Sequence, residues 1–200
     1  MSGRELHVIS NGKSSLQHFA DIAGQIHPYV TAFHIREKQM SAKELMVGVS
    51  FLKEKGIPLS KIVINDRVDV AAISRVSGVH LASHSLDAEL IKQTFPYLRV
   101  GCSVHSLKEA LSMEQKQVDY VFYGHIYETA SKPGLPGRGL NELATITQKL
   151  QIPIIAIGGI KISNMNEVLT AGASGIAVMS GLLEAENPLE EVIRYRQLLK

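Results

Sequence analysis

The sequence predicts a single closed barrel of eight parallel strands and eight helices, the (β/α)8 or TIM barrel. Short β-rich segments alternate strictly with helical patterns along the whole chain, and several segments are continuous apolar runs, such as residues 153–159 and 175–181. Such runs are typical of parallel strands buried on both faces. Strict alternation indicates a parallel sheet, and eight units is the number that closes a barrel. An open doubly wound sheet is the alternative, because alternation alone does not require closure.

Local signals place the individual elements. Strands are expected at residues 6–10, 30–37, 61–65, 78–82, 99–104, 120–125, 153–159 and 175–180. Helix starts are indicated where Gln or Glu follows Ser by three residues, or where Asn precedes Pro, at Ser14, Ser41, Ser106 and Asn187. Gly56 and Gly172 stand where helices should stop. The longest irregular connection should be residues 128–138, which follow the sixth strand.

Composition indicates one domain over residues 1–200, because this length and an apolar share of 45% suffice for one substantial core. The net charge of +2 does not call for a nucleic acid or a membrane as partner. Cys102 is the only cysteine, and residues 1–5 begin no apolar leader segment. We therefore expect a cytoplasmic protein.

Glycines at the ends of the last two strands indicate a phosphate site. Residues 156–160 read Ala-Ile-Gly-Gly-Ile and residues 178–181 read Val-Met-Ser-Gly. Backbone amides can approach an anion closely at glycines, and these two loops are the frequent phosphate site of such barrels. The alternative is that the glycines only form tight corners. The residues expected to bind phosphate are Gly158, Gly159, Ile160, Ser180 and Gly181.

Polar residues follow the other strands. His34, Arg36 and Lys38 share one face of the second strand, and such a face is hard to bury unless it meets an anion at the barrel mouth. Asn65 follows the third strand, where Asp66 either faces a ligand or caps the next helix. Ser103 ends the fifth strand two residues before His105, so both point the same way.

His125 is the strongest candidate for catalysis. It ends the sixth strand, directly before a loop that contains Thr129 and Lys132. Histidine titrates near neutral pH, so it can both accept and deliver a proton. The alternative is a hydrogen-bonded structural histidine. A metal site is not expected, because His80 and His84 on an extended strand would be about 13 Å apart.

Together these segments resemble the thiamin phosphate synthase superfamily along nearly the whole chain. The matching stretches are residues 34–38, 64–69, 78–81, 101–106, 119–120, 129–132, 156–160 and 177–180. Two departures favour its thiazole tautomerase (TenI-like) branch. The synthase pattern places Gly-Gln and a magnesium-binding acid after the fourth strand, where this chain has residues 82–85 without a carboxylate. It also has Gly-Pro after the sixth strand, where this chain has Gly124 and His125.

The resemblance to that branch implies an isomerase of thiamin biosynthesis. Such an enzyme aromatises a carboxythiazole phosphate tautomer by proton transfer through one histidine, here His125, with no metal and no other cofactor. Its partner would be a small phosphorylated thiazole, and by analogy the chain could form a homodimer. Substrate contacts are expected from Arg36, Lys38, Asn65, Ser103, Thr129 and Lys132.

Two other functions remain open at this point. One is a magnesium-dependent thiamin phosphate synthase, with Arg36, Lys38, Asn65 and Lys132 around a diphosphate. The other is a non-catalytic, ligand-sensing regulatory barrel that retains the phosphate pocket.

Overall fold

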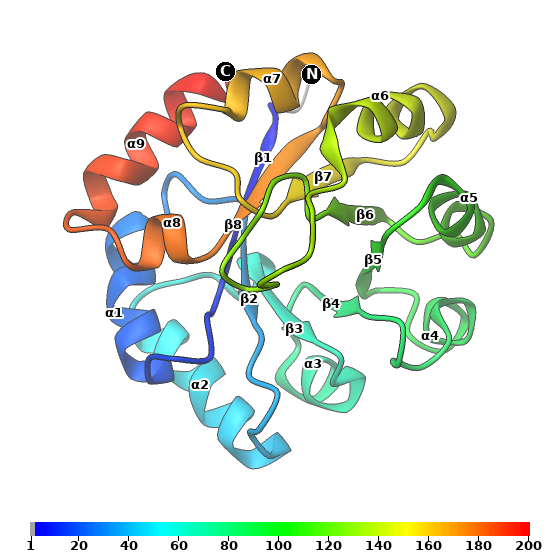
Figure 1. The fold of residues 1–200 in the computed structure, drawn as a ribbon. Coiled ribbons are helices and arrows are strands. Elements are labelled where there is room, and N and C mark those ends of the chain that lie inside the picture. Colours follow the sequence, from blue (N-terminus) through cyan, green and yellow to red (C-terminus); the bar gives the residue numbers. More distant parts are fainter. Residues whose placement is uncertain (1–2) are drawn as a thin grey trace.

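The computed structural model describes residues 3–200 as a closed barrel of eight parallel strands. Each strand pairs with the next one in the sequence, and β8 pairs with β1, so the predicted TIM barrel is confirmed and the open sheet is wrong. Figure 1 looks into the barrel, with the helices forming a ring around the strands. The strands are β1 (Glu5–Ile9), β2 (Ala32–Ile35), β3 (Ile62–Asn65), β4 (Gly78–Leu81), β5 (Arg99–Val104), β6 (Tyr120–Gly124), β7 (Ile154–Ile157) and β8 (Gly175–Val178).

The described residues form one α-helix more than expected, together with one 3-10 turn. These elements are α1 (Leu16–Ile26), α2 (Ala42–Glu54), the 3-10 turn η1 (Leu59–Lys61), α3 (Val68–Ser74), α4 (Ala88–Thr94), α5 (Leu107–Gln115), α6 (Gly139–Lys149), α7 (Met165–Thr170), α8 (Ser180–Leu183) and α9 (Pro188–Leu198). The additional helix is the single turn α8. It is separate because Asn187 and Pro188 start a new helix after it. Met1 and Ser2, which belong to the segment expected to contain no leader, lie outside the described residues.

Helix caps follow the predicted signals at three of four positions. The Ser41 hydroxyl and the Glu44 carboxylate form a complete capping box, and the side chains of Ser106 and Asn187 each accept from the amide three residues on. The prediction for Ser14 was wrong by one residue, since Ser15 caps α1. The reason is that the Asn11 side chain accepts from the Ser14 amide and holds it in a turn.

The hydrophobic core has two parts. The larger part lies between the strands and the surrounding helices, and the smaller part fills the barrel with Ile9, Tyr120, Phe122, Ile155 and Ala177. No helix among residues 3–200 is long and apolar enough to cross a membrane.

Three buried histidines share the barrel interior with this smaller core. His7, His34 and His80 are each at most 2% exposed. The expectation that the cationic face of β2 needs an anion was wrong for His34. Its ring nitrogens lie 2.9 Å from His7 Nδ1 and 3.3 Å from Asn65 Oδ1, so protein groups satisfy them.

An ion pair lies at the opposite end of the barrel from its mouth. The Glu5 carboxylate accepts two hydrogen bonds from Arg99, at 2.8 and 3.0 Å, and lies 2.8 Å from His7 Nε2. Burial by itself would raise the pKa of Glu5. The hydrogen bonds from His7 and Arg99 outweigh burial and lower that pKa to about 2.

We predict that Glu5→Gln destabilises the fold at pH 7 by about 3 kcal/mol, because Arg99 and His7 lose a charged acceptor. A carboxyl group whose pKa is lowered in the folded state stabilises it above the unfolded value, near 4.5, and loses this effect as the pH falls toward 2. Urea unfolding of both proteins between pH 7 and pH 3 measures the difference, which should shrink below about pH 4.5. A difference independent of pH would contradict the assignment.

Candidate active site

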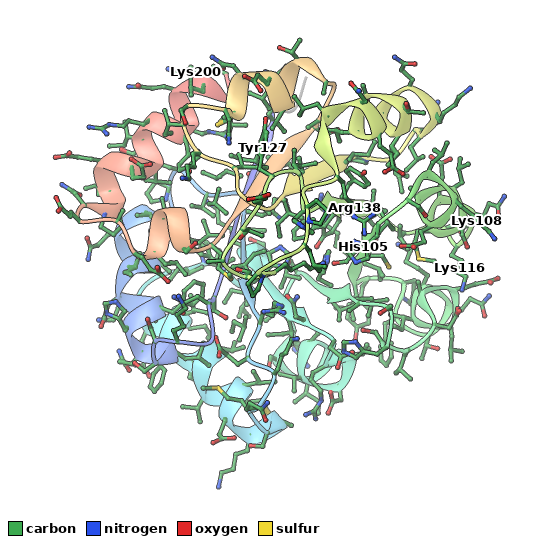
Figure 2. The ribbon with its side chains drawn as sticks, in the orientation of Figure 1. His105, Lys108, Lys116, Tyr127, Arg138 and Lys200 are labelled. Atoms are coloured by element: carbon green, nitrogen blue, oxygen red, sulfur yellow. The ribbon has the colours of Figure 1, made fainter. Side chains whose placement is uncertain are left out.

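A cavity of about 640 Å³ opens at the carboxyl ends of the strands. Its lining includes ten of the twelve predicted site residues: Arg36, Ser103, His125, Thr129, Lys132, Gly158, Gly159, Ile160, Ser180 and Gly181. Figure 2 labels His105 and Arg138 close to this mouth and Lys108 and Lys116 out on the helical ring. The strand ends therefore bring together polar groups that are far apart in the sequence.

The predicted phosphate corner lies between β7 and β8. Gly158, Gly159 and Ile160 follow β7, while Ser180 and Gly181 form the first turn of α8. In residues 3–200, the amides of Gly159 and Ile160 donate to no backbone carbonyl, and first-turn amides of a helix have no acceptor within it. These amides can therefore donate to an anion in the cavity.

Close packing against the loop after β6 explains why glycine occupies positions 158 and 159. Both have positive φ, +97° and +67°. A Cβ at Gly158 would lie 2.3 Å from His125 Cβ, and one at Gly159 would lie 2.6 Å from the Glu128 carbonyl oxygen. The glycines thus let the loop of His125 approach β7 closely.

We predict that Gly158→Ala weakens binding of inorganic phosphate and lowers stability by about 1–3 kcal/mol, because its methyl group would displace His125. Gly134→Ala is the matched control, since Gly134 also has positive φ, +75°, but a Cβ added there would meet no atom within 4 Å. Phosphate titration by calorimetry and urea unfolding measure the two effects. Equal losses in both variants would mean that close packing at position 158 has no role.

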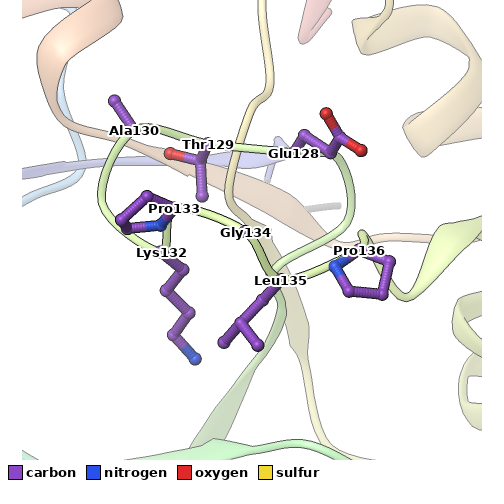
Figure 3. A pocket seen from close by; sticks show the side chains of 8 residues that line it. All are labelled: Glu128, Thr129, Ala130, Lys132, Pro133, Gly134, Leu135 and Pro136. Atoms are coloured by element: carbon purple, nitrogen blue, oxygen red, sulfur yellow. The ribbon is translucent and has the colours of Figure 1, made fainter.

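The loop between β6 and α6 crosses the mouth, as the yellow-green segment over the barrel centre in Figure 1 shows. It is the longest connection among the described residues, as expected for residues 128–138. Figure 3 shows Lys132 and Leu135 pointing to one side of the loop and Glu128 to the other. The base of the loop is fixed by Arg138, whose guanidinium donates to the carbonyl oxygens of Gly124 at 3.1 Å and His105 at 2.6 Å.

His125 lies under this loop and is 6% exposed. Its Nε2 is 3.2 Å from the Leu135 carbonyl oxygen. Its Nδ1 is also buried and has no hydrogen-bond partner among residues 3–200. Buried polar atoms are nearly always paired in native proteins, so this free nitrogen is a position that a bound molecule can fill.

Two predicted residues do not line the cavity. Lys38 is exposed, in the loop after β2. Asn65 is half-buried and contacts His34. Asp66 does not cap α3 with its side chain, and its carboxylate lies 3.8 Å from His84 Nε2.

Four charged residues that line the cavity were not predicted as site residues from the sequence: Lys13, Glu128, Lys161 and Glu184. Lys13 Nζ lies 3.0 Å from the Glu184 carboxylate, although 171 residues separate them. Lys13 follows the end of β1, and Lys161 follows the glycines after β7. Their positions just beyond strand ends could therefore have indicated from the sequence that the two lysines line the cavity.

This fold and cavity define a TIM barrel with a polar, partly covered mouth whose free backbone amides can receive an anion. The family model described as thiamine monophosphate synthase (TMP-TENI) matches residues 6–182, and the chain belongs to this family. A thiamine-phosphate synthase of Albidiferax ferrireducens is 35% identical over 89% of this chain and 83% of its own, and one of Chloroflexus aurantiacus is 34% identical over 96% and 88%. The solved thiamine phosphate pyrophosphorylase of Pyrococcus furiosus has 30% identity and a TM-score of 0.83, over 98% of this chain and 95% of its own.

These relatives confirm the resemblance at the level of the family and correct the predicted activity. The curated relatives are named thiamine-phosphate synthases, which are transferases. The prediction of an isomerase, the thiazole tautomerase, was therefore wrong, and the expectation of metal-independent chemistry falls with it. The tautomerase prediction rested on two local departures, residues 82–85 and His125, whereas the likeness to the synthases extends along nearly the whole chain.

Proposed function

We propose that this chain is a thiamine-phosphate synthase, which joins a pyrimidine carrying a diphosphate to a thiazole carrying a phosphate. The observation that carries the proposal is the likeness to synthases over about nine-tenths of the chain, at 35% identity. The cavity supports it, because its wall offers two kinds of anion-binding group. Backbone amides lie at the ends of β7 and β8, and the cations Arg36 and Lys132 also line it.

The proposed reaction is a substitution at carbon. The thiazole nitrogen forms a bond to the exocyclic methylene carbon of the pyrimidine, and the bond from that carbon to the diphosphate oxygen breaks. The diphosphate leaves with the electron pair, so negative charge increases where it departs. Arg36 and Lys132, which line the cavity, are the proposed diphosphate contacts, and the amides of Gly158–Ile160 and Ser180–Gly181 are the proposed contacts of the thiazole phosphate. Fixed cations near a departing anion lower the barrier.

His125 remains the proposed catalytic side chain, together with Ser103 and Thr129 as substrate contacts. The buried Nδ1 of His125 supports this role, since it has no hydrogen-bond partner among residues 3–200 and lies in a residue that lines the cavity. Within the family, the absence of a carboxylate at residues 82–85 and the presence of His125 also support a place near the TenI-like branch. Closeness to the TenI-like branch describes how the sequences are related. The activity that we propose is the synthase reaction. A cytoplasmic location remains part of the proposal, on the single buried cysteine.

The synthase reaction is tested by incubating the purified protein with the pyrimidine diphosphate, the thiazole phosphate and magnesium, and measuring thiamine phosphate and released diphosphate. We expect both products in equal amounts. Arg36→Gln should reduce kcat/KM about tenfold or more, because a charged contact is lost. Lys108→Gln, a charge change on the outer face of α5, should leave the rate unchanged. No coupling by the wild-type protein would overturn the proposal.

Magnesium, which the synthase alternative calls for, finds only part of a site in this chain. Residues 82–85 supply no carboxylate, and no group of three or more His, Cys, Asp or Glu side chains with metal-binding geometry occurs in residues 3–200. Magnesium accepts as little as one protein carboxylate when substrate phosphates supply further oxygens. Asp66, which directly follows β3, would be that carboxylate, and the ion when bound would offset the charge of the diphosphate.

We predict that His84→Asp strengthens magnesium binding, because the new carboxylate would face Asp66, whose Oδ2 lies 3.8 Å from His84 Nε2. Two carboxylates should lower the magnesium concentration for half-maximal effect by about tenfold. Calorimetric titration with magnesium alone measures binding without the reaction. His18→Asp, the same change on the exposed face of α1, is the control, and equal affinities in both variants would contradict the placement of the ion.

A further inference from the structure

The interior of the barrel contains a hydrogen-bonded row of three side chains that ends at the cavity. His80 lies between the other two, with Nδ1 3.3 Å from Tyr120 Oη and Nε2 2.9 Å from Ser103 Oγ. Tyr120 and His80 are 1% and 2% exposed, whereas Ser103 lines the cavity. These residues come from β6, β4 and β5, so only the closed barrel brings them together.

Aromatic packing holds the His80 ring in place. Its centroid lies 4.1 Å from that of Phe122 and 5.6 Å from that of Tyr120. The Arg99 guanidinium lies 4.5 Å from the Tyr120 ring centroid on the side away from the mouth, where a cation on the ring face is favourable. With these contacts the ring has little freedom to rotate, so its two nitrogens keep their separate partners.

The direction of each hydrogen bond follows from the donors available. A phenol has one proton to donate, and His80 Nδ1 is the acceptor that the described residues place within reach of Tyr120 Oη. If Nδ1 carried a proton, the buried phenol proton would have no acceptor. Tyr120 therefore donates to Nδ1, and the single proton of a neutral imidazole must be on Nε2, which donates to Ser103 Oγ.

Both groups keep the protonation state that this direction requires. Burial is the main cause that lowers the pKa of His80 to about 3, with smaller electrostatic contributions from His7 and Arg36, so the ring is neutral at pH 7. Burial also raises the pKa of Tyr120, so the phenol keeps its proton.

We propose that Tyr120 and His80 are positioning residues that make the Ser103 hydroxyl a hydrogen-bond donor to the substrate. Because Ser103 Oγ already accepts from His80, its own proton is left to donate, and the open side of Ser103 is the cavity. The group it recognises is an acceptor, an anionic or carbonyl oxygen or a ring nitrogen without a proton. Arg36 lines the same cavity and favours an anionic oxygen. Assigning this acceptor to one of the two coupling substrates rests on the proposed function.

The tautomer of His80 tests the proposal without any assay of activity. In protein labelled with ¹⁵N-histidine, the NMR signals of His80 are identified by their loss in His80→Gln. We expect a protonated Nε2 and an unprotonated Nδ1 in the wild type, and a mixture of both tautomers in Tyr120→Phe. The control is Tyr123→Phe, which removes a phenol that donates to Glu142 and is not bonded to His80. A protonated Nδ1 in the wild type would overturn the proposal.

A double-mutant cycle tests the effect on substrate. Ser103→Ala and Tyr120→Phe should each raise KM about three- to tenfold at unchanged kcat, the usual range for one hydrogen bond. Tyr120→Phe should add no further increase in the Ser103→Ala background, because its effect passes through Ser103. Additive increases would show a general structural role for Tyr120 and overturn the proposal. If the wild type shows the expected tautomer but no coupling, the proposed function fails and the positioning of Ser103 stands.

Discussion

Hydrogen bonds between buried polar side chains, histidine rings among them, hold the interior of this barrel together. Glu5 and Arg99 pair at the end away from the mouth, His7 contacts Glu5, and His34 connects His7 with Asn65. Burying a polar group is unfavourable unless it is hydrogen-bonded, so these side chains depend on one another for their stability. The result is a rigid interior in which groups at the mouth are held by partners deeper in the barrel.

The phosphate corner depends on a second constraint, the close approach of the loop after β6 to the end of β7. The Ile126 and Tyr127 amides donate to the carbonyl oxygens of Ile157 and Gly158, at 2.9 and 3.1 Å. The glycines leave space for this contact, and the same contact places His125 beside the amides that can bind an anion. Anion binding and the position of the candidate catalytic residue are therefore linked through the backbone.

The family could be recognised from the sequence, but the predicted activity was wrong. Ordered matches along the chain predicted the family because they mark the ends of successive strands, where this fold carries its site. The tautomerase was inferred from two positions, residues 82–85 and His125. A single histidine at a strand end does not determine a reaction, because the reaction depends on which ligands the whole cavity holds in contact with it.

The sequence by itself determined the eightfold alternation of strands and helices, the order of the barrel and the glycines at the ends of β7 and β8. These features are local, since periodicity, caps and glycine positions are set by neighbouring residues. The burial of His34, the row from Tyr120 to Ser103, and the pairing of Lys13 with Glu184 required the tertiary structure. Their partners are between 23 and 171 residues apart in the chain, and only closure of the barrel places them within hydrogen-bonding distance.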